Sequence, residues 1–360
     1  MPEGKRYKSV AKTSLAELID RYSSEGELYE KSEDNKVLCY ACGHRCLIFD
    51  GLRGICKVRY NEGGRLYVPK GYVAGLQCDP TEKKPFFHVL PGSSTLTFGM
   101  LGCDYHCSYC QNWLTSQALR DAAAGIAPIK ATAEQLVSLA KRYEARLIGS
   151  SYNEPLITAE WSGDVFRLAR KEGFRTAFIS NGNATKEVLE YLRPITDCYK
   201  VDLKSVQDKN YRKLGGILSN VLETISRLYD MGFWVEIVTL VVPGFNDSID
   251  ELKQAAKFLV SLSSDIPWHV TGFHKDYKMT DPENTPAETL MRVAEIGYEA
   301  GLRFVYAGNL PGQVKNYENT YCPNCDRLLI ERYGYNILSY QVTPDGKCPG
   351  CSSLIPGIWQ

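Results

Sequence analysis

Between about residues 94 and 312, short hydrophobic runs alternate with longer stretches in which apolar residues recur every three or four positions. Runs rich in β-branched residues predict buried strands, and the three-to-four spacing predicts amphipathic helices. The predicted strands are Thr95–Gly99, Arg146–Ser151, Thr176–Ser180, Cys198–Leu203, Val235–Val242, Trp268–Phe273 and Phe304–Ala307. The predicted helices are Ala133–Tyr143, Trp161–Lys171, Lys186–Leu192, Ile217–Asp230, Asp250–Leu262 and Ala287–Ala300.

This alternation indicates βαβ units and a parallel sheet, so the predicted fold class is α/β. Six or seven such units fit an incomplete (β/α)6-type barrel better than a closed barrel of eight. In such barrels, polar side chains at the C-terminal ends of the strands gather around one site.

The flanking segments predict two small modules. Residues 1–93 combine a helical stretch at Leu15–Tyr22 with short β-like runs such as Arg65–Val68, separated by Gly and Asp. Residues 313–360 carry β-like runs at Leu328–Arg332 and Ile337–Val342. We therefore divide the chain at 1–93, 94–312 and 313–360, with metal ions expected to stabilise both end modules.

Composition adds few constraints. The 360 residues are 44% hydrophobic and 23% charged, and 42 basic residues balance 42 acidic ones. A net charge of zero gives no support for binding to nucleic acid or to a membrane surface. No apolar run reaches the roughly 18–20 residues of a membrane span. The basic segment Met1–Lys12 precedes no hydrophobic signal core, which predicts a cytoplasmic protein.

The thirteen cysteines change the picture, because eleven of them fall into three tight clusters. Short local spacing without a signal peptide favours metal ligation over disulfides. Cys78 and Cys198 lie outside the clusters, and we expect both to be buried free thiols.

The central cluster follows the first predicted strand. Cys103, Cys107 and Cys110 are spaced Cys-x3-Cys-x2-Cys, so one loop can supply thiolates to three irons of a cubane. The fourth iron then has an open position for an external ligand. A zinc knuckle that borrows His106 is the alternative, which the position of the loop in a βα array disfavours.

With an aromatic residue, Tyr109, directly before the last cysteine, this loop resembles that of the radical S-adenosylmethionine (SAM) superfamily. The resemblance implies an oxidoreductase whose [4Fe–4S] cluster binds SAM through its amino and carboxylate groups. One-electron reduction, from a donor such as ferredoxin or flavodoxin, then gives methionine and a 5′-deoxyadenosyl radical.

Polar residues at the ends of later strands are candidates to bind the rest of SAM. Glu154 is suited to the cationic amino group, and Asn181 to the ribose hydroxyls or the carboxylate. The full candidate set is Asn153, Glu154, Ser180, Asn181, Asp202, Lys204 and His274. The alternative is that these residues cap helices or pair with one another, as Asp202 and Lys204 could.

The two flanking cysteine clusters each offer four thiolates. Cys322, Cys325, Cys348 and Cys351 form two CxxC knuckles, and the 22 residues 326–347 between them slightly exceed a usual zinc-ribbon interval of about 15–20. They predict a structural Zn²⁺ site, with a rubredoxin-like iron site as the rival. Cys39, Cys42, Cys46 and Cys56, with His44 nearby, predict either zinc or an auxiliary [4Fe–4S] cluster.

From about Val37 to Trp359, the chain resembles the radical SAM enzymes of the AmmeMemoRadiSam system, relatives of the pyruvate formate-lyase activating enzyme. Beyond the cluster loop, the matching strings are Cys39–Cys46, Arg53–Arg59, Asp79–Pro85, Tyr152–Pro155, Val242–Asp247, Tyr321–Cys325 and Ile355–Trp359. The resemblance implies an N-terminal extension, a C-terminal metal knuckle and a protein partner of the Memo or Ammecr type.

One departure separates this chain from the activases, which usually carry Asp-Thr-Asn-Gly after the third strand. Here the sequence is Ile179-Ser180-Asn181-Gly182. The missing Asp favours modification of a small molecule or a partner side chain over activation of a glycyl radical enzyme. A non-catalytic metal-binding scaffold for a Memo-like partner is the candidate from another functional class.

Overall fold

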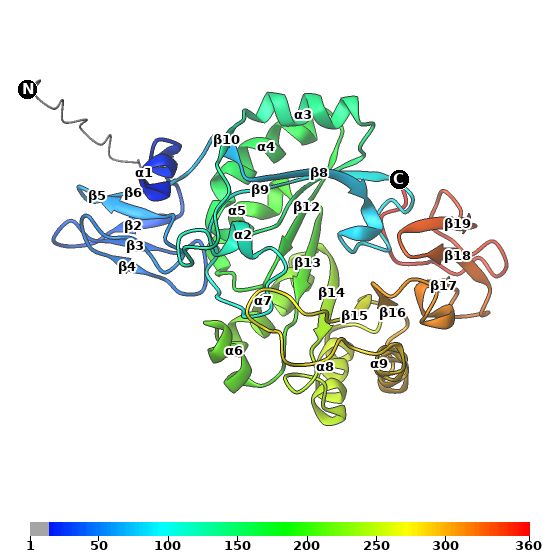
Figure 1. The fold of residues 1–360 in the computed structure, drawn as a ribbon. Coiled ribbons are helices and arrows are strands. Elements are labelled where there is room, and N and C mark those ends of the chain that lie inside the picture. Colours follow the sequence, from blue (N-terminus) through cyan, green and yellow to red (C-terminus); the bar gives the residue numbers. More distant parts are fainter. Residues whose placement is uncertain (1–13) are drawn as a thin grey trace, which may run out of the picture.

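The computed structural model describes residues 14–360, so the basic segment Met1–Lys12 lies outside the described residues. Its centre is one eight-stranded sheet in the order β16-β15-β14-β13-β12-β11-β9-β8 (Figure 1). The seven parallel strands are β9 (Ser94–Gly99), β11 (Leu147–Ser150), β12 (Arg175–Ser180), β13 (Cys198–Asp202), β14 (Trp234–Val241), β15 (Trp268–Gly272) and β16 (Val305–Gly308).

Because the parallel strands follow one another in sequence order, each crossover steps the same way and the sheet curls into an incomplete barrel. The predicted fold class is therefore confirmed. Helices cover the outer face of the sheet (Figure 1). They are α3 (Ala133–Arg142), α4 (Ala159–Lys171), α5 (Lys186–Leu192), α6 (Asp208–Leu214), α7 (Leu218–Asp230), α8 (Ile249–Leu262) and α9 (Ala287–Ala300).

Successive side chains of each strand point to opposite faces of the sheet, so one set packs in the core and the other faces the lumen. Phe178, Tyr199 and Ile237 join the hydrophobic core under the helices. Their neighbours Lys200 and Val238 face the inside of the barrel. Polar side chains at the inward positions predict a lumen that binds something, since a purely structural core would be apolar.

Strand β8 (Gly75–Pro80) was not predicted from the sequence. It is antiparallel to β9 over its whole length, so the predicted boundary at residue 93 falls between two paired strands. Gly75–Pro80 lacks the hydrophobic run that marks the other strands, and only its pairing with β9 makes it a strand.

The segment after β8 closes the lower end of the barrel. It begins with the 3-10 turn η1 (Thr81–Lys83), and Phe86, Val89 and Leu90 then pack against the barrel residues Leu147 and Ala177. The buried Glu236 carboxylate accepts hydrogen bonds from the backbone N–H groups of Phe87 (2.9 Å) and His88 (3.0 Å). This segment therefore forms the floor of the lumen.

The N-terminal module consists of α1 (Leu15–Asp20) and two three-stranded sheets (Figure 1). One contains β1 (Ser23–Glu25), β6 (Arg65–Pro69) and β5 (Tyr60–Glu62), and the other β2 (Tyr29–Lys31), β3 (Val37–Cys39) and β4 (Leu47–Ile48). A connecting pair, β7 (Tyr72–Val73) and β10 (Ile129–Lys130), joins the module to the barrel.

The C-terminal module contains the sheet of β17 (Thr320–Tyr321), β18 (Leu328–Tyr333) and β19 (Asn336–Tyr340), beside the β16 end of the barrel (Figure 1). The chain then returns to the floor, where Ile358 exchanges backbone hydrogen bonds with His88 and Leu90, both at 2.7 Å. Within residues 14–360, no helix is long and apolar enough to cross a membrane.

Candidate active site

The central cysteines lie on a loop, called here the cluster loop (residues 100–112), between β9 and the short helix α2 (Trp113–Ser116). Gly102 has a φ of +93°, which turns the chain sharply before Cys103. Cys107 is buried, while Cys103 and Cys110 are partly buried. The Cys110 thiol lies 3.1 Å from the Ser116 hydroxyl. Burial raises the pKa of the Cys107 thiol to about 12.

The loop is fixed to the ends of neighbouring strands by Asp104. Its buried carboxylate accepts hydrogen bonds from Asn181 Nδ2 (2.7 Å) and Asn183 Nδ2 (2.9 Å), which follow β12. It also lies 3.7 Å from the Cys103 sulfur. The candidate Asn181 thus binds the cluster loop itself, and the network holds Cys103 at the C-terminal end of the sheet.

Glu154 lies four residues after β11, directly before the 3-10 helix η2 (Pro155–Thr158). Its carboxylate accepts hydrogen bonds from the Ser180 hydroxyl (2.8 Å) and the backbone N–H groups of Asn181 (2.6 Å) and Leu156 (3.0 Å). Burial, and next the charge of Asp104, raise the pKa of Glu154 to about 8. The adjacent Asn153 accepts a hydrogen bond from the Met100 backbone (3.0 Å), so both candidates support the cluster loop.

Asp202 at the end of β13 stands between two lysines. It forms ion pairs with Lys200 and with Lys204, the latter at 3.2 Å. Although burial opposes the charged form, the two ammonium groups lower the pKa of Asp202 to about 2. The pairing of Asp202 with Lys204, considered above as an alternative to a binding role, is present, and all three side chains still line the lumen.

His274, after β15, lies at the exposed rim. Its Nε2 is 2.9 Å from Gln111 Nε2 of the cluster loop. The structure therefore places all the strand-end candidates around one loop, some in the buried network and His274 at its edge.

A cavity of about 690 Å³ extends from the cluster loop into the lumen. Cys107 and Cys110 line its upper end, and Phe87 and His269 line its floor. Because the cysteines open directly onto the cavity, a molecule held in it lies next to the cluster site.

The open side of the incomplete barrel is bridged by the C-terminal module. Tyr335, in the turn between β18 and β19, lines the cavity opposite Asp79 and Lys83 from the β8 side. Asp79 is paired with Lys83 (2.9 Å) and Lys84 (2.7 Å). Charged groups therefore line the cavity far from the cysteines as well.

Two buried ionisable groups on the β8 side of the cavity, Glu82 and Lys84, have shifted pKa values. The Glu82 Oε2 atom has no hydrogen-bond partner, and burial raises the pKa of this carboxyl. Burial lowers the pKa of Lys84 despite its ion pair with Asp79. Such perturbed groups in a cavity are typical of binding sites.

The sequence did not single out Asp79, Glu82 and Lys84 as functional residues. Their only signal was the string Asp79–Pro85 among those that carried the family resemblance. Lys200, Asp104 and Tyr335 were also missed, because nothing local marks an inward-facing lysine, a loop carboxylate or a turn tyrosine as part of a site.

The C-terminal cysteines form a compact set. Among residues 14–360, they are the single group of three or more Cys, His or acidic side chains whose ligand atoms all lie within 4.8 Å of one another. Cys322 and Cys351 are 3.5 Å apart, and Cys325 and Cys348 are 3.7 Å apart. Tetrahedral ligands at about 2.3 Å from one ion stand about 3.8 Å apart, so this set fits a single metal ion.

Cys39 lies at the end of β3, and the thiols of Cys42, Cys46 and Cys56 lie near it. Cys39, Cys42 and Cys56 are buried and Cys46 is partly exposed. Arg59 is fully buried beside them and pairs with Glu160 through two hydrogen bonds of 2.7 Å. Burial opposes its charge, but Cys39 and Glu160 raise the pKa of Arg59 further.

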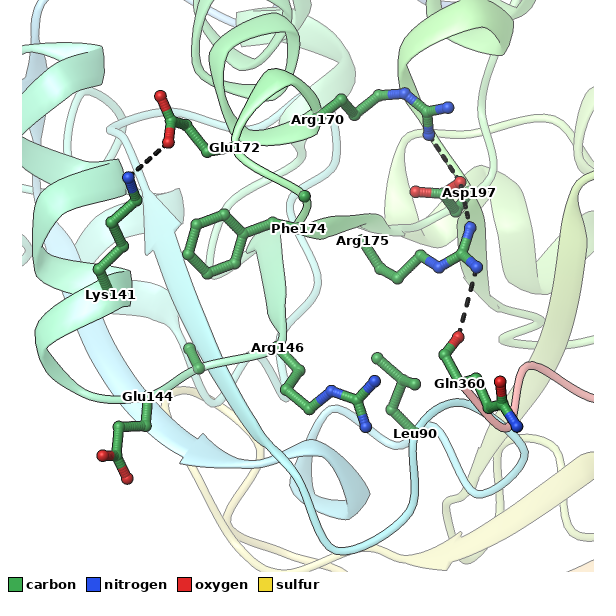
Figure 2. Close-up of a pocket in the computed structure, with 12 residues that line it drawn as sticks. Leu90, Lys141, Glu144, Arg146, Arg170, Glu172, Phe174, Arg175, Asp197 and Gln360 are labelled. Carbon is green, nitrogen blue, oxygen red and sulfur yellow. Dashed lines mark hydrogen bonds and ion pairs between the residues drawn. The ribbon is translucent and has the colours of Figure 1, made fainter. Parts of the chain in front are cut away.

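A second hollow, of about 630 Å³, lies at the opposite end of the strands (Figure 2). Of its cations, Lys141 is paired with Glu172, and Arg170 with Asp197 at 2.6 Å. No cysteine lines it. We therefore assign the chemistry to the lumen.

Comparison with known proteins places the chain in a family. A model of the radical SAM superfamily matches residues 98–259, which contain the cluster loop. An uncharacterized protein of Methanocaldococcus jannaschii is 41% identical over 334 residues, which cover 92% of this chain and 98% of the relative. This chain belongs to the radical SAM superfamily.

Other relatives are more distant. The pyruvate formate-lyase 1-activating enzyme of Escherichia coli K12 is 27% identical over 236 residues, 60% of this chain and 93% of that enzyme. A solved radical SAM methyltransferase from Sphaerobacter thermophilus has a TM-score of 0.48 at 17% identity, covering 61% of this chain and 67% of that one. A domain of the pyruvate-formate lyase-activating enzyme from Bacteroides vulgatus has a TM-score of 0.39 at 21% identity, covering 43% and 94%.

The cluster loop fits the [4Fe–4S] cluster that this superfamily implies. It presents three thiols from one loop, and within residues 14–360 they do not form a group close enough for a single ion. Thiolates that bind separate irons of a cubane stand farther apart. The His106 ring packs against Gly215, where an added Cβ would lie 2.6 Å from Nδ1.

Proposed function

We propose that this radical SAM protein binds a [4Fe–4S] cluster through Cys103, Cys107 and Cys110, binds SAM beside it, and removes a hydrogen atom from a substrate in the lumen. The observation that carries the proposal is the cavity that opens onto Cys107 and Cys110. When bound, cluster and SAM supply a one-electron reductive cleavage that yields methionine and a 5′-deoxyadenosyl radical.

The residues of this chain hold and orient the cofactors. We assign Asn153, Glu154, Ser180 and Asn181 to the SAM side of the loop, where Glu154 already accepts three hydrogen bonds. A carboxylate has about four lone-pair positions, so Glu154 can accept one more donor, such as an ammonium group. Asp202 and Lys204 face the lumen, and His274 at the rim is a candidate to contact the nucleoside.

The enclosed lumen favours a small molecule, or a narrow segment of a partner protein, as substrate. Its floor is closed by residues 86–90, and Tyr335 restricts the open side. Paired ammonium and carboxylate groups line it, so we infer a polar substrate. A glycyl radical activase is the second candidate, favoured by the 27% identity to an activating enzyme.

Three further assignments belong to this proposal. The compact C-terminal set holds a structural Zn²⁺. A protein of the Memo or Ammecr type is a partner or carries the substrate. The cytoplasm is the site of action, because all thirteen cysteines are unbridged and reductive cluster chemistry needs a reducing compartment.

The first test is anaerobic reconstitution with iron and sulfide, followed by reduction with dithionite in the presence of SAM. We expect 5′-deoxyadenosine from the wild type and none from Cys107→Ala, while both unfold at similar temperatures. Turnover by Cys107→Ala would refute the cluster assignment. A fully loaded wild type that never cleaves SAM, with any extract added, would instead favour the scaffold.

The source of the hydrogen atom separates the candidate substrates. Deuterated cell extract is divided into small-molecule and protein fractions, and each is added to the reduced enzyme. Deuterium in 5′-deoxyadenosine from the small-molecule fraction alone supports the small substrate. Deuterium from the protein fraction alone, with an oxygen-sensitive glycyl radical signal, supports the activase.

A further inference from the structure

We propose that Cys39, Cys42, Cys46 and Cys56 bind a second [4Fe–4S] cluster, through which the electron for SAM cleavage reaches the cluster loop. The site itself is independent of the proposed function, whereas its role as an electron relay rests on it. The sequence left zinc and iron–sulfur open for these four cysteines, and the arrangement of the thiols favours iron–sulfur.

The spacing of the sulfurs is the first observation. The C-terminal cysteines stand within 4.8 Å of one another, as ligands of one ion do. Within residues 14–360, no three of the N-terminal cysteines meet that distance, and neither do the three of the cluster loop. Both sets are therefore spaced more widely than the C-terminal set.

The surroundings of the N-terminal thiols suit an anionic cluster. Backbone N–H groups lie within hydrogen-bond reach of the Cys42, Cys46 and Cys56 thiols. Such N–H groups tune the potential of Fe–S clusters by hydrogen bonding to sulfur. Arg59, whose charge is paired with Glu160, is buried beside them, and its Nε is a buried donor without a partner.

The four cysteines also adjoin the cluster loop directly. A Cβ added to Gly102 would lie 2.7 Å from Val58 and 3.1 Å from the Cys56 carbonyl oxygen, so the two loops touch next to Cys103. Arg120 donates to the Ile55 carbonyl (2.7 Å) and the Tyr105 carbonyl (2.8 Å), which fastens one loop to the other.

The N-terminal site is accessible to an electron donor. Cys46 is partly exposed and Ile55 is 45% exposed. A one-electron donor such as ferredoxin or flavodoxin can thus approach the N-terminal site. The donor loses one electron, the N-terminal cluster is reduced and reoxidised, and the cluster at Cys103, Cys107 and Cys110 gains that electron.

The deciding experiment uses the full chain with Cys103, Cys107 and Cys110 all replaced by Ala, which leaves the N-terminal site intact. After anaerobic reconstitution, we expect this triple variant to retain about half of the wild-type iron and sulfide. Reduction with dithionite should produce the EPR signal of a reduced [4Fe–4S] cluster. Loss of all bound iron, or zinc in place of iron, would overturn the second cluster.

A complementary variant tests the relay. In Cys39→Ser/Cys42→Ser, we expect about half of the iron to remain and SAM still to alter the EPR signal of the remaining cluster, whereas cleavage driven by reduced flavodoxin falls at least tenfold. Cys78→Ala, outside all three clusters, is the control and should match the wild type. Unchanged flavodoxin-driven cleavage would refute the relay.

The two proposals fail separately. If the wild type never cleaves SAM, the proposed function fails. The iron content of the triple variant still decides the second cluster.

Discussion

Glu154 illustrates at the scale of one residue how a buried group can organise a site. Its three hydrogen bonds come from β12 and from its own 3-10 turn. They hold the Asn181 backbone in the position from which the Asn181 side chain reaches Asp104. A carboxylate so enclosed is costly to ionise unless a cation arrives.

This residue makes stability depend on pH. Its folded-state pKa of about 8 exceeds an unfolded value of about 4.3, so its contribution is complete below about pH 4.3 and is lost as the pH rises through 8. We expect the melting temperature of the cofactor-free protein to fall between pH 5 and 8, and to fall several degrees less in Glu154→Gln.

Calorimetry across this pH range checks the prediction. Glu187→Gln is the control, because Glu187 is an exposed carboxylate paired with Arg45. It should reproduce the wild-type slope. Identical slopes for wild type and Glu154→Gln would show that Glu154 ionises normally in the folded protein.

Also at the residue scale, position 179 affects which charged groups the lumen contains. Ile179 stands where related activases carry Asp, and its register neighbour on β13 is Lys200. Lys200 pairs with Asp202, so the lumen holds a lysine ammonium and an aliphatic chain at this level. Sequence alone revealed the missing carboxylate, while the added ammonium emerged only from strand pairing.

At the scale of an element, the cluster loop depends on its close contact with the N-terminal module as well as on its cysteines. Gly102 combines a left-handed φ of +93° with contacts to Val58 and Cys56 that leave no room for a side chain. Gly63 has a φ of +60° and nothing within 4 Å, so it shares the strain without the crowding.

We expect Gly102→Ala to destabilise the protein by about 1–3 kcal/mol more than Gly63→Ala, because both contribute backbone strain but only the former displaces a neighbour. Chemical denaturation of the two variants measures the difference. Gly102→Ala should also retain less iron after reconstitution. Equal stabilities would mean that the contact between the two loops is easily relaxed.

At the scale of the whole molecule, a buried ion pair attaches the N-terminal module to the barrel. Arg59 comes from the module and Glu160 from α4, and both are nearly inaccessible to solvent. Glu160 also accepts hydrogen bonds from the Glu27 and Leu28 backbone N–H groups, both at 3.3 Å.

Arg59→Met should cost about 3–5 kcal/mol, because Glu160 is left as an unpaired buried charge. Adding Glu160→Gln removes that charge and should restore part of the loss. Arg45→Ala breaks an exposed pair with Glu187 and should cost less than about 1 kcal/mol. If Arg59→Met and Arg45→Ala cost the same, the buried pair would not be the attachment point.

The C-terminal module links its compact cysteine set to the lumen, because its hairpin carries Tyr335 and its last residues pair with the floor at His88. We expect Cys322→Ala to lose the bound metal and to lower the melting temperature by roughly 5–10 °C, since metal binding contributes folding free energy. Metal analysis and calorimetry test this, with Cys78→Ala as the control. An unchanged melting temperature in a metal-free variant would deny the module a structural metal.

The sequence by itself determined the parallel barrel strands, six of the seven helices that cover them and the superfamily, because each of these elements carries its own hydrophobic period and the cluster-loop cysteines are close together in the chain. It missed the short helix α6 (Asp208–Leu214). It did not reveal β8, whose six residues 75–80 lack a hydrophobic run, nor the floor formed by residues 86–90. It could not place Lys200, Glu82 and Tyr335 in one cavity either. Those features depend on strand pairing and on contacts between distant segments, which only the tertiary structure decided.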